Sequence, residues 1–167
     1  MPLKKLKIAV SACLLGMRYR YDGQAKLNKE LVDSLYNKVD IIPVCPEVEC
    51  GLEIPRPKMR LELSSLGTRL KIIDSRQDIT LKMEEWAETK IQQLEKKDIA
   101  AFLCKSKSPS CALNSASIFT CSGRCVHSKG QGLFTRLLKQ KNSKILIKEE
   151  NDLKDFIKLL NLDVFQK

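Results

Sequence analysis

The chain has 167 residues, 43% of them apolar, and its 30 lysines and arginines outnumber 20 aspartates and glutamates, giving a formal net charge of +10. This length fits a single domain (residues 1–167) with a core of its own, which excludes a fold that needs disulfides or a structural metal merely to be stable. No secretory signal and no apolar stretch of membrane-spanning length is found, so we expect a cytoplasmic protein without a membrane partner.

The predicted elements alternate between strands and helices. Short apolar runs indicate buried strands, and apolar residues three or four positions apart indicate helices. In chain order we predict a strand at 7–13, a helix at 30–37, a strand at 40–45, a β-hairpin at 59–74, a helix at 78–96, a strand at 99–104, a helix at 132–141, a strand at 144–147 and a helix at 153–160. This order predicts an α/β fold of the Rossmann-like three-layer type, a mostly parallel open sheet with helices on both faces and a small β-hairpin insertion.

The chain has seven cysteines, which is an odd number and more than an average reduced protein contains. In a reducing compartment this count indicates metal binding or thiol chemistry rather than disulfides. Cys13 ends the first predicted strand, Cys45 ends the second, and Cys111 follows the third by a short loop. In open α/β sheets the carboxyl ends of the strands form the edge where ligands bind. We therefore expect the three thiols to converge at this edge.

Three converged thiolates could bind zinc, hold an iron–sulfur cluster or carry out redox chemistry. Zinc sites usually contain close pairs such as C-x-x-C, and a redox pair needs a resolving thiol beside the nucleophile. Widely spaced single cysteines suit a cluster, in which each iron takes one thiolate. Three protein ligands would leave one iron open as a Lewis acid. A fourth ligand would close it, and Cys50 is the candidate, five residues beyond Cys45.

Five short motifs carry a resemblance to a known family. They are SACLLG from Ser11, RYDG from Arg20, PVCPEV from Pro43, PRP from Pro55 and KSPSC from Lys107. In this order and from Lys7 to about Glu149, they resemble the thiouracil desulfidase family, which was formerly a family of unknown function.

The resemblance implies an enzyme with a [4Fe–4S] cluster held by Cys13, Cys45 and Cys111. It implies that the substrate is a small thiolated pyrimidine, such as 2- or 4-thiouracil, and that hydrolysis releases its sulfur as sulfide. The family's catalytic carboxylate matches Glu47, and its active-site serine matches Ser108. The chain departs from the family's pattern at Cys50 and Ala112, where glycine is usual.

Other interpretations stay open at this point. Cys50 as a fourth ligand would favour a redox- or sulfur-sensing protein that binds a cluster, and zinc without sulfide would indicate a non-enzymatic domain. A second metal site is conceivable at Cys104, Cys121, Cys125 and His127. The segment from Ile99 to Lys148 holds nine lysines and arginines and no acidic residue, so thiolated RNA is a possible but not favoured substrate. The oligomeric state is open.

Overall fold

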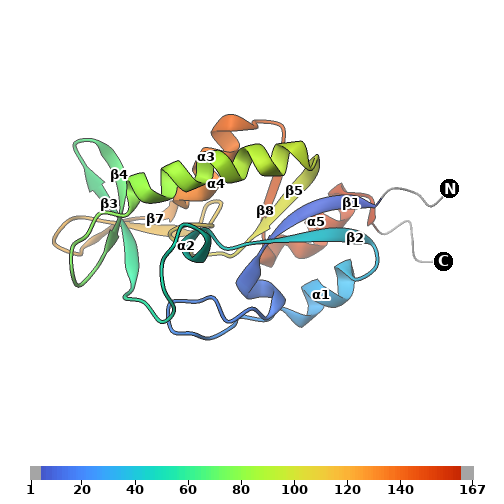
Figure 1. Cartoon of the computed structure of the whole chain (residues 1–167), viewed down its shortest axis with the longest axis horizontal. Coiled ribbons are helices and arrows are strands. Elements are labelled where there is room, and N and C mark those ends of the chain that lie inside the picture. The colour runs from blue at the N-terminus through green and yellow to red at the C-terminus, as the bar shows by residue number, and fades with distance from the viewer. Residues whose placement is uncertain (1–4, 163–167) are drawn as a thin grey trace.

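The computed structural model describes residues 5–162, and its centre is a four-stranded parallel sheet, here called sheet A (Figure 1). The strands lie in the order β2-β1-β5-β8, and every neighbouring pair is parallel. Their bounds are Leu6–Ser11 for β1, Val39–Val44 for β2, Ile99–Cys104 for β5 and Leu146–Glu149 for β8. Each strand corresponds to one of the four predicted from short apolar runs.

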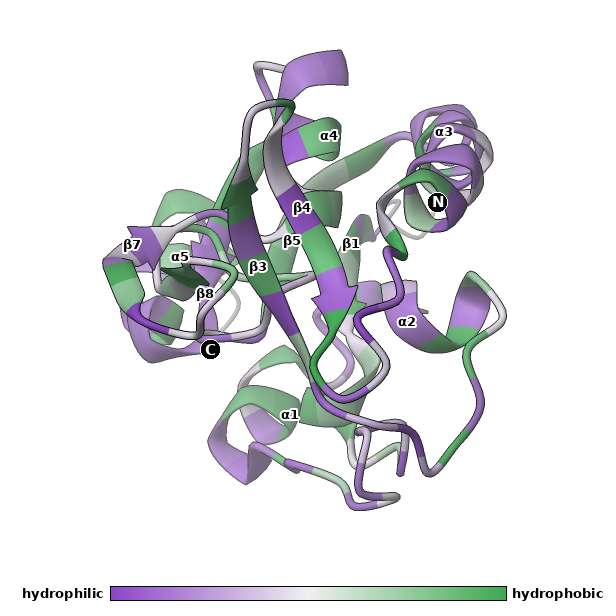
Figure 2. Cartoon of the chain, turned by 90° about the vertical axis from the view of Figure 1, so that its left-hand side faces the viewer, coloured by the Kyte–Doolittle hydropathy of each residue, from purple (hydrophilic) through white to green (hydrophobic). Residues whose placement is uncertain are grey.

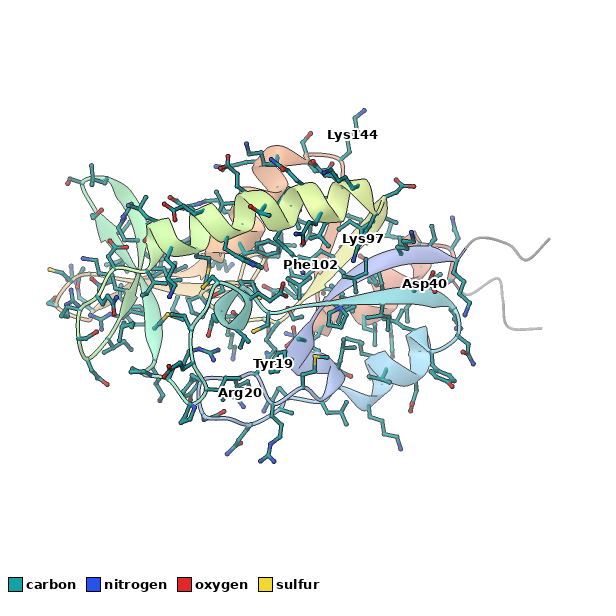
Figure 3. All side chains as sticks on the ribbon, in the orientation of Figure 1. Tyr19, Arg20, Asp40, Lys97, Phe102 and Lys144 are labelled. Atoms are coloured by element: carbon teal, nitrogen blue, oxygen red, sulfur yellow. The ribbon has the colours of Figure 1, made fainter. Side chains whose placement is uncertain are left out.

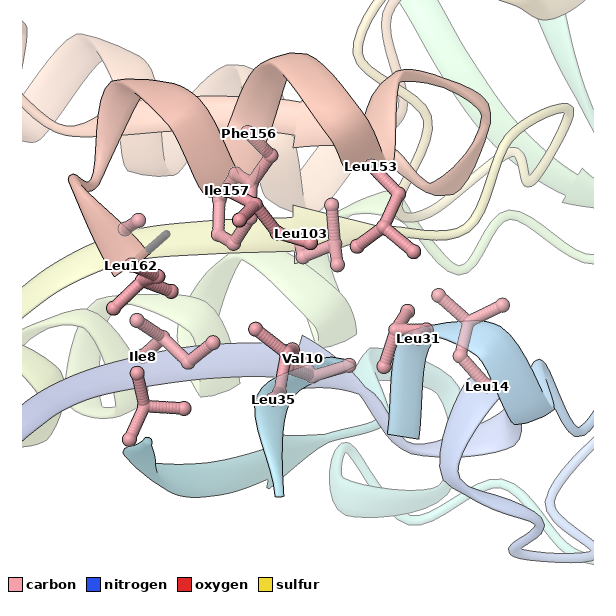
Figure 4. Packing of buried hydrophobic residues seen from close by; sticks show 12 residues of the cluster. Ile8, Val10, Leu14, Leu31, Leu35, Leu103, Leu153, Phe156, Ile157 and Leu162 are labelled. Atoms are coloured by element: carbon pink, nitrogen blue, oxygen red, sulfur yellow. The ribbon is translucent and has the colours of Figure 1, made fainter. Parts of the chain in front are cut away.

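Helices cover both faces of sheet A. Val10 and Leu103 pack against α1 (Lys29–Leu35) and α5 (Leu153–Leu159), as Figure 4 shows in close-up. Their neighbours Ala9 and Phe102 point to the opposite face, toward α3 (Thr80–Lys96) and α4 (Leu133–Lys141). Because successive side chains of a strand alternate between faces, apolar runs such as Ile8–Val10 fill both layers of core. The predicted three-layer α/β architecture is thereby confirmed.

Two helix starts follow the expected capping chemistry. The side chain of Asn28 accepts a hydrogen bond from the N–H of Leu31 at 3.0 Å, which places the beginning of α1. Asp78 accepts from the N–H of Thr80 at 2.9 Å just ahead of α3. The hydroxyl of Thr80 instead accepts from the backbone of Leu70, which joins the helix start to the neighbouring strand.

The predicted hairpin is part of a second sheet, sheet B, of order β4-β3-β6-β7. Its strands are β3 (Met59–Ser64), β4 (Gly67–Ile72), β6 (Ala116–Phe119) and β7 (Cys125–Gly130). Figure 2 looks onto this sheet and shows apolar and polar residues alternating along β3. The sequence analysis did not predict β6, which has only four residues, or β7, where five of six side chains are exposed and no alternation exists.

Three short elements follow strands of sheet A: η1 (Ala12–Leu15) after β1, α2 (Pro46–Glu49) after β2, and η2 (Glu150–Asp152) after β8. They turn the chain directly at the carboxyl ends of the strands. No helix within residues 5–162 combines the length and the apolar character that crossing a membrane requires.

Candidate active site

A cavity of about 300 Å³ lies at the carboxyl edge of sheet A. Its wall includes Cys13, Cys45 and Cys111, together with Glu47 and Ser108. Tyr19 and Arg20, which Figure 3 labels, belong to the loop between η1 and α1 and close one side. The structure therefore brings all five site residues predicted from the sequence to one cavity.

Each cysteine sits on a short, hydrogen-bonded turn. Cys13 lies in η1, two residues beyond the end of β1, and its carbonyl accepts from the N–H of Lys26 at 3.0 Å. Cys45 directly follows β2 as the residue before α2, and its N–H donates to Glu49 at 2.9 Å. The N–H of Cys111 donates to the hydroxyl of Ser108 at 3.0 Å. These contacts are made by backbone atoms of the cysteines, so they hold the three turns without using the thiols.

The loop that carries Cys111 is held by the start of α4. The N–H groups of Gly132, Leu133 and Phe134 donate to the carbonyls of this loop, at 2.8 to 2.9 Å. A Cβ atom on Gly132 would lie 2.5 Å from the carbonyl carbon of Ser110, so only glycine permits this approach. The predicted helix start at Gly132 thus serves to position the third cysteine.

Burial raises the pKa of all three thiols. It raises the pKa of Cys45 to about 11, that of Cys13 above its usual value, and that of Cys111 well above it. Lys105 beside Cys13 and Arg56 beside Cys45 act in the opposite direction, because a nearby cation favours the thiolate. Such buried thiols are poor nucleophiles without a ligand, and the two cations are themselves paired with the carboxylates of Glu150 and Glu47.

The three thiols fit a group of several metal atoms better than a single ion. A single zinc ion holds its thiolates at about 2.3 Å, which draws them close together. Among residues 5–162, no three cysteine, histidine or acidic side chains are grouped closely enough to hold one ion. In an iron–sulfur cluster each thiolate binds a different iron, so the ligands can surround a cavity, as these do.

Glu47 is held from both ends of its carboxylate. Arg56 donates to Oε2 through Nε at 2.9 Å and through Nη2 at 2.5 Å. Ser110, whose side chain is completely buried, donates to Oε1 at 2.9 Å. The sequence analysis did not identify Ser110. In the sequence, Ser110 is one of two serines just before Cys111, and nothing in the motif showed that it, rather than Ser108, would contact Glu47.

The other cysteines lie elsewhere. Cys50 does not line the cavity; it packs in the core between sheet B and α3, and its thiol donates to the carbonyl of Glu47 at 3.3 Å. The suggested second metal site is not assembled, because Cys104 is buried at the end of β5 whereas Cys121, Cys125 and His127 lie exposed at the turn and edge of sheet B. Among residues 5–162 these four side chains form no group that could hold one ion, so the structure does not support the alternative of a second metal site.

Comparison with known proteins gives one family and one solved structure. Residues 8–150 match the model of a family described as 2-thiouracil desulfurase. A solved structure described as [4Fe-4S]-dependent thiouracil desulfidase TudS is 34% identical, with a TM-score of 0.76, and the match covers 95% of this chain and 99% of that one. A comparison with curated proteins finds no match.

Proposed function

The chain belongs to the 2-thiouracil desulfurase family, and we propose that it is a [4Fe–4S]-dependent desulfidase that removes sulfur from a thiolated pyrimidine base. The observation that carries this proposal is the convergence of Cys13, Cys45, Cys111 and Glu47 on one cavity. The three thiolates would hold the cluster, and a carboxylate lies beside the place where a base would bind. The reaction is a hydrolysis, in which C=S and water give C=O and hydrogen sulfide.

The cluster, when bound by three cysteines, supplies an iron without a protein ligand that acts as a Lewis acid toward soft sulfur donors. We expect Cys50 to leave that position free, because it does not line the cavity and its thiol donates to the carbonyl of Glu47. The cysteine at this position, which differs from the family's usual glycine, is therefore compatible with catalysis.

Glu47 is the general base of the proposed reaction. Both contacts from Arg56 go to Oε2, and Ser110 occupies one lone pair of Oε1. Oε1 retains a second lone pair, with which it takes a proton from the attacking water. The two fixed donors hold the carboxylate in one orientation, so the water is aligned before the substrate reacts.

Ser108 is the proposed donor to the pyrimidine ring. Its Oγ accepts from the N–H groups of Ser110 at 3.2 Å and Cys111 at 3.0 Å. Both lone pairs of the hydroxyl are thereby used, which leaves its hydrogen for a ring nitrogen or oxygen. Ser108 thus links the turn that carries Cys111 to the substrate.

We place the protein in the cytoplasm as part of this proposal, because thiolate ligands need a reducing compartment. The favoured substrate is a free thiolated base, since the cavity of about 300 Å³ has the size of a small-molecule site. Thiolated RNA stays a possible but less favoured substrate, supported by the basic segment after Ile99.

The proposal is tested by anaerobic turnover of cluster-loaded protein with 2-thiouracil and 4-thiouracil in water enriched in ¹⁸O. We expect equal amounts of sulfide and uracil from at least one of them, with ¹⁸O in the new carbonyl. Full cluster content without turnover of either base would refute the desulfidase function, and uracil without ¹⁸O would refute the hydrolytic route.

A further inference from the structure

The two faces of the pyrimidine ring need a contact of their own. Glu47 and Ser108 act at the edge of the ring, where the C=S group, the nitrogens and the oxygen lie. A flat conjugated ring also has two apolar faces, and in binding sites such faces pack well against an aromatic side chain. Among the described residues that line the cavity, only Tyr19 and Tyr21 are aromatic. One of these two rings is therefore the candidate for stacking on the base.

The ring of Tyr21 is already in use. The guanidinium of Arg20 lies 5.7 Å from its centre, and the ammonium of Lys58 lies 5.5 Å from it. Within residues 5–162, by contrast, no other aromatic ring pairs with Tyr19 and no cation lies over its ring. Tyr19 is thus the aromatic side chain of the cavity wall whose faces are left for a substrate.

The backbone of Tyr19 is fixed beside the proposed general base. Nη2 of Arg56 donates to the carbonyl of Tyr19 at 2.9 Å and also to Oε2 of Glu47 at 2.5 Å. The N–H of Arg56 donates to the carbonyl of Tyr21 at 2.8 Å, which holds the loop at a second point. A tyrosine side chain has only two rotatable bonds, so a ring on a fixed backbone offers contact area at a low cost in conformational entropy.

We infer that Tyr19 is a specificity-determining residue of the active site, whose ring stacks on one face of the thiolated pyrimidine. The inference rests on the proposed function and deepens it, because it assigns the contact that selects a flat conjugated ring over other compounds with a C=S group. Tyr19 stands directly before the RYDG motif and belongs to none of the five motifs that carry the family resemblance. The preference for a flat ring is therefore expected as a property of this chain's own sequence.

Base binding is measured first, on cluster-loaded protein and independently of turnover, with uracil and 5,6-dihydrouracil as probes in calorimetry. Dihydrouracil has the same polar edge, but its ring is puckered and lacks a conjugated face. We expect Tyr19→Leu to bind uracil at least about fivefold more weakly, because stacking of a base on an aromatic ring contributes roughly 5- to 150-fold. Tyr19→Phe should bind uracil like the wild type, and all variants should keep the wild-type iron content.

The matched control is Tyr36→Leu, which makes the same change at the end of α1, where the side chain is 69% exposed and outside the cavity. The ratio of uracil to dihydrouracil affinity should fall in Tyr19→Leu and stay unchanged in Tyr36→Leu, and this ratio does not depend on the fraction of active protein. An unchanged ratio in Tyr19→Leu would overturn the inference. An equal loss in Tyr19→Phe would also overturn it, because the hydroxyl rather than the ring would then make the contact.

Kinetics separates this inference from the proposed function. The wild type should have a higher kcat/KM for 2-thiouracil than for 5,6-dihydro-2-thiouracil, and Tyr19→Leu should lose this preference through KM with little change in kcat. Turnover of 2-thiouracil with the same preference in both proteins would overturn the stacking role and leave the desulfidase function standing. A fall in uracil binding in Tyr19→Leu, without turnover of any thiolated base by the wild type, would instead refute the function and leave the stacking contact established.

Discussion

At the scale of single residues, the carboxylate of Glu47 is constrained more tightly than an ordinary surface acid. Arg56 and Ser110 each take one of its oxygens, and the side chain of Arg56 is only 6% exposed. Arg56 also donates to the carbonyls of Tyr19 and Glu53, so the guanidinium itself has little freedom. The proposed general base therefore depends on two partners, Arg56 at a distance of nine positions in the sequence and Ser110 at a distance of 63.

Replacing Glu47 with Gln should abolish sulfide release and leave the cluster content unchanged. Ser110→Ala should lower kcat by roughly 10- to 100-fold with little change in KM, because a hydrogen bond to a charged group contributes about 1.5–3 kcal/mol. The control is Ser115→Ala, which removes a hydroxyl bonded to a different carboxylate, that of Glu149. A kcat of Ser110→Ala equal to that of the control would show that Ser110 does not position Glu47.

The thiol of Cys45 should react slowly in cluster-free protein. Burial raises its pKa to about 11, and only the thiolate is nucleophilic, so its alkylation rate should rise about tenfold per pH unit from pH 7 toward pH 11. Mass spectrometry after iodoacetamide treatment measures this rate for each cysteine. A rate that levels off near pH 9 would mean that the cluster-free site is open to water.

At the scale of elements, the start of α4 determines the shape of the third cysteine loop. Thr135 in the first turn of α4 also donates its hydroxyl to the carbonyl of Cys111 at 2.5 Å. Together with the close approach of Gly132, this contact fixes the Cys111 loop against the first turn of α4. We therefore expect the glycine before α4 to be needed for cluster binding through Cys111.

Gly132→Ala should destabilise the protein by about 1–3 kcal/mol, because the added methyl overlaps backbone atoms that have no room to move. It should also reduce the iron content of the reconstituted protein, since the Cys111 loop is displaced. Thermal unfolding and iron analysis measure the two effects, and Gln131→Ala is the matched control. Normal stability together with normal iron content would contradict this role.

Sequence reasoning predicted these elements unequally well. The strands of sheet A could be predicted because short apolar runs such as Ile99–Cys104 are typical of strands that are buried on both faces. The edge strand β7 could not, because its side chains are exposed on both faces and only backbone pairing defines it. The site was also only partly predictable. The strand ends indicated where the cysteines lie, but the contact between Ser110 and Glu47 joins residues 63 positions apart and leaves no local pattern in the sequence.

At the scale of the whole molecule, α3 connects the two sheets. Trp86 on α3 packs against the core beside sheet A and also against the core beside sheet B, and Leu137 on α4 does the same. The cysteines lie at the carboxyl edge of sheet A, whereas Arg56, which holds Glu47, lies in the segment that leads into β3 of sheet B. The proposed active site therefore depends on both sheets.

We propose that residues 1–167 form one domain, and we expect a single cooperative unfolding transition. Trp86, the one tryptophan, reports on the shared core by fluorescence, and circular dichroism reports on both sheets and all helices. The two signals should give the same midpoint in urea. Separate midpoints would mean that sheet B unfolds independently.

The most direct test of the account is the iron and acid-labile sulfide content of protein purified without oxygen, measured together with zinc. The wild type and Cys50→Ser should each contain about four irons and four sulfides per chain, whereas Cys13→Ser, Cys45→Ser and Cys111→Ser should lose most of both. Zinc without sulfide in the wild type, even after cluster reconstitution, would contradict the cluster. Loss of iron and sulfide in Cys50→Ser would contradict the assignment of the three ligands.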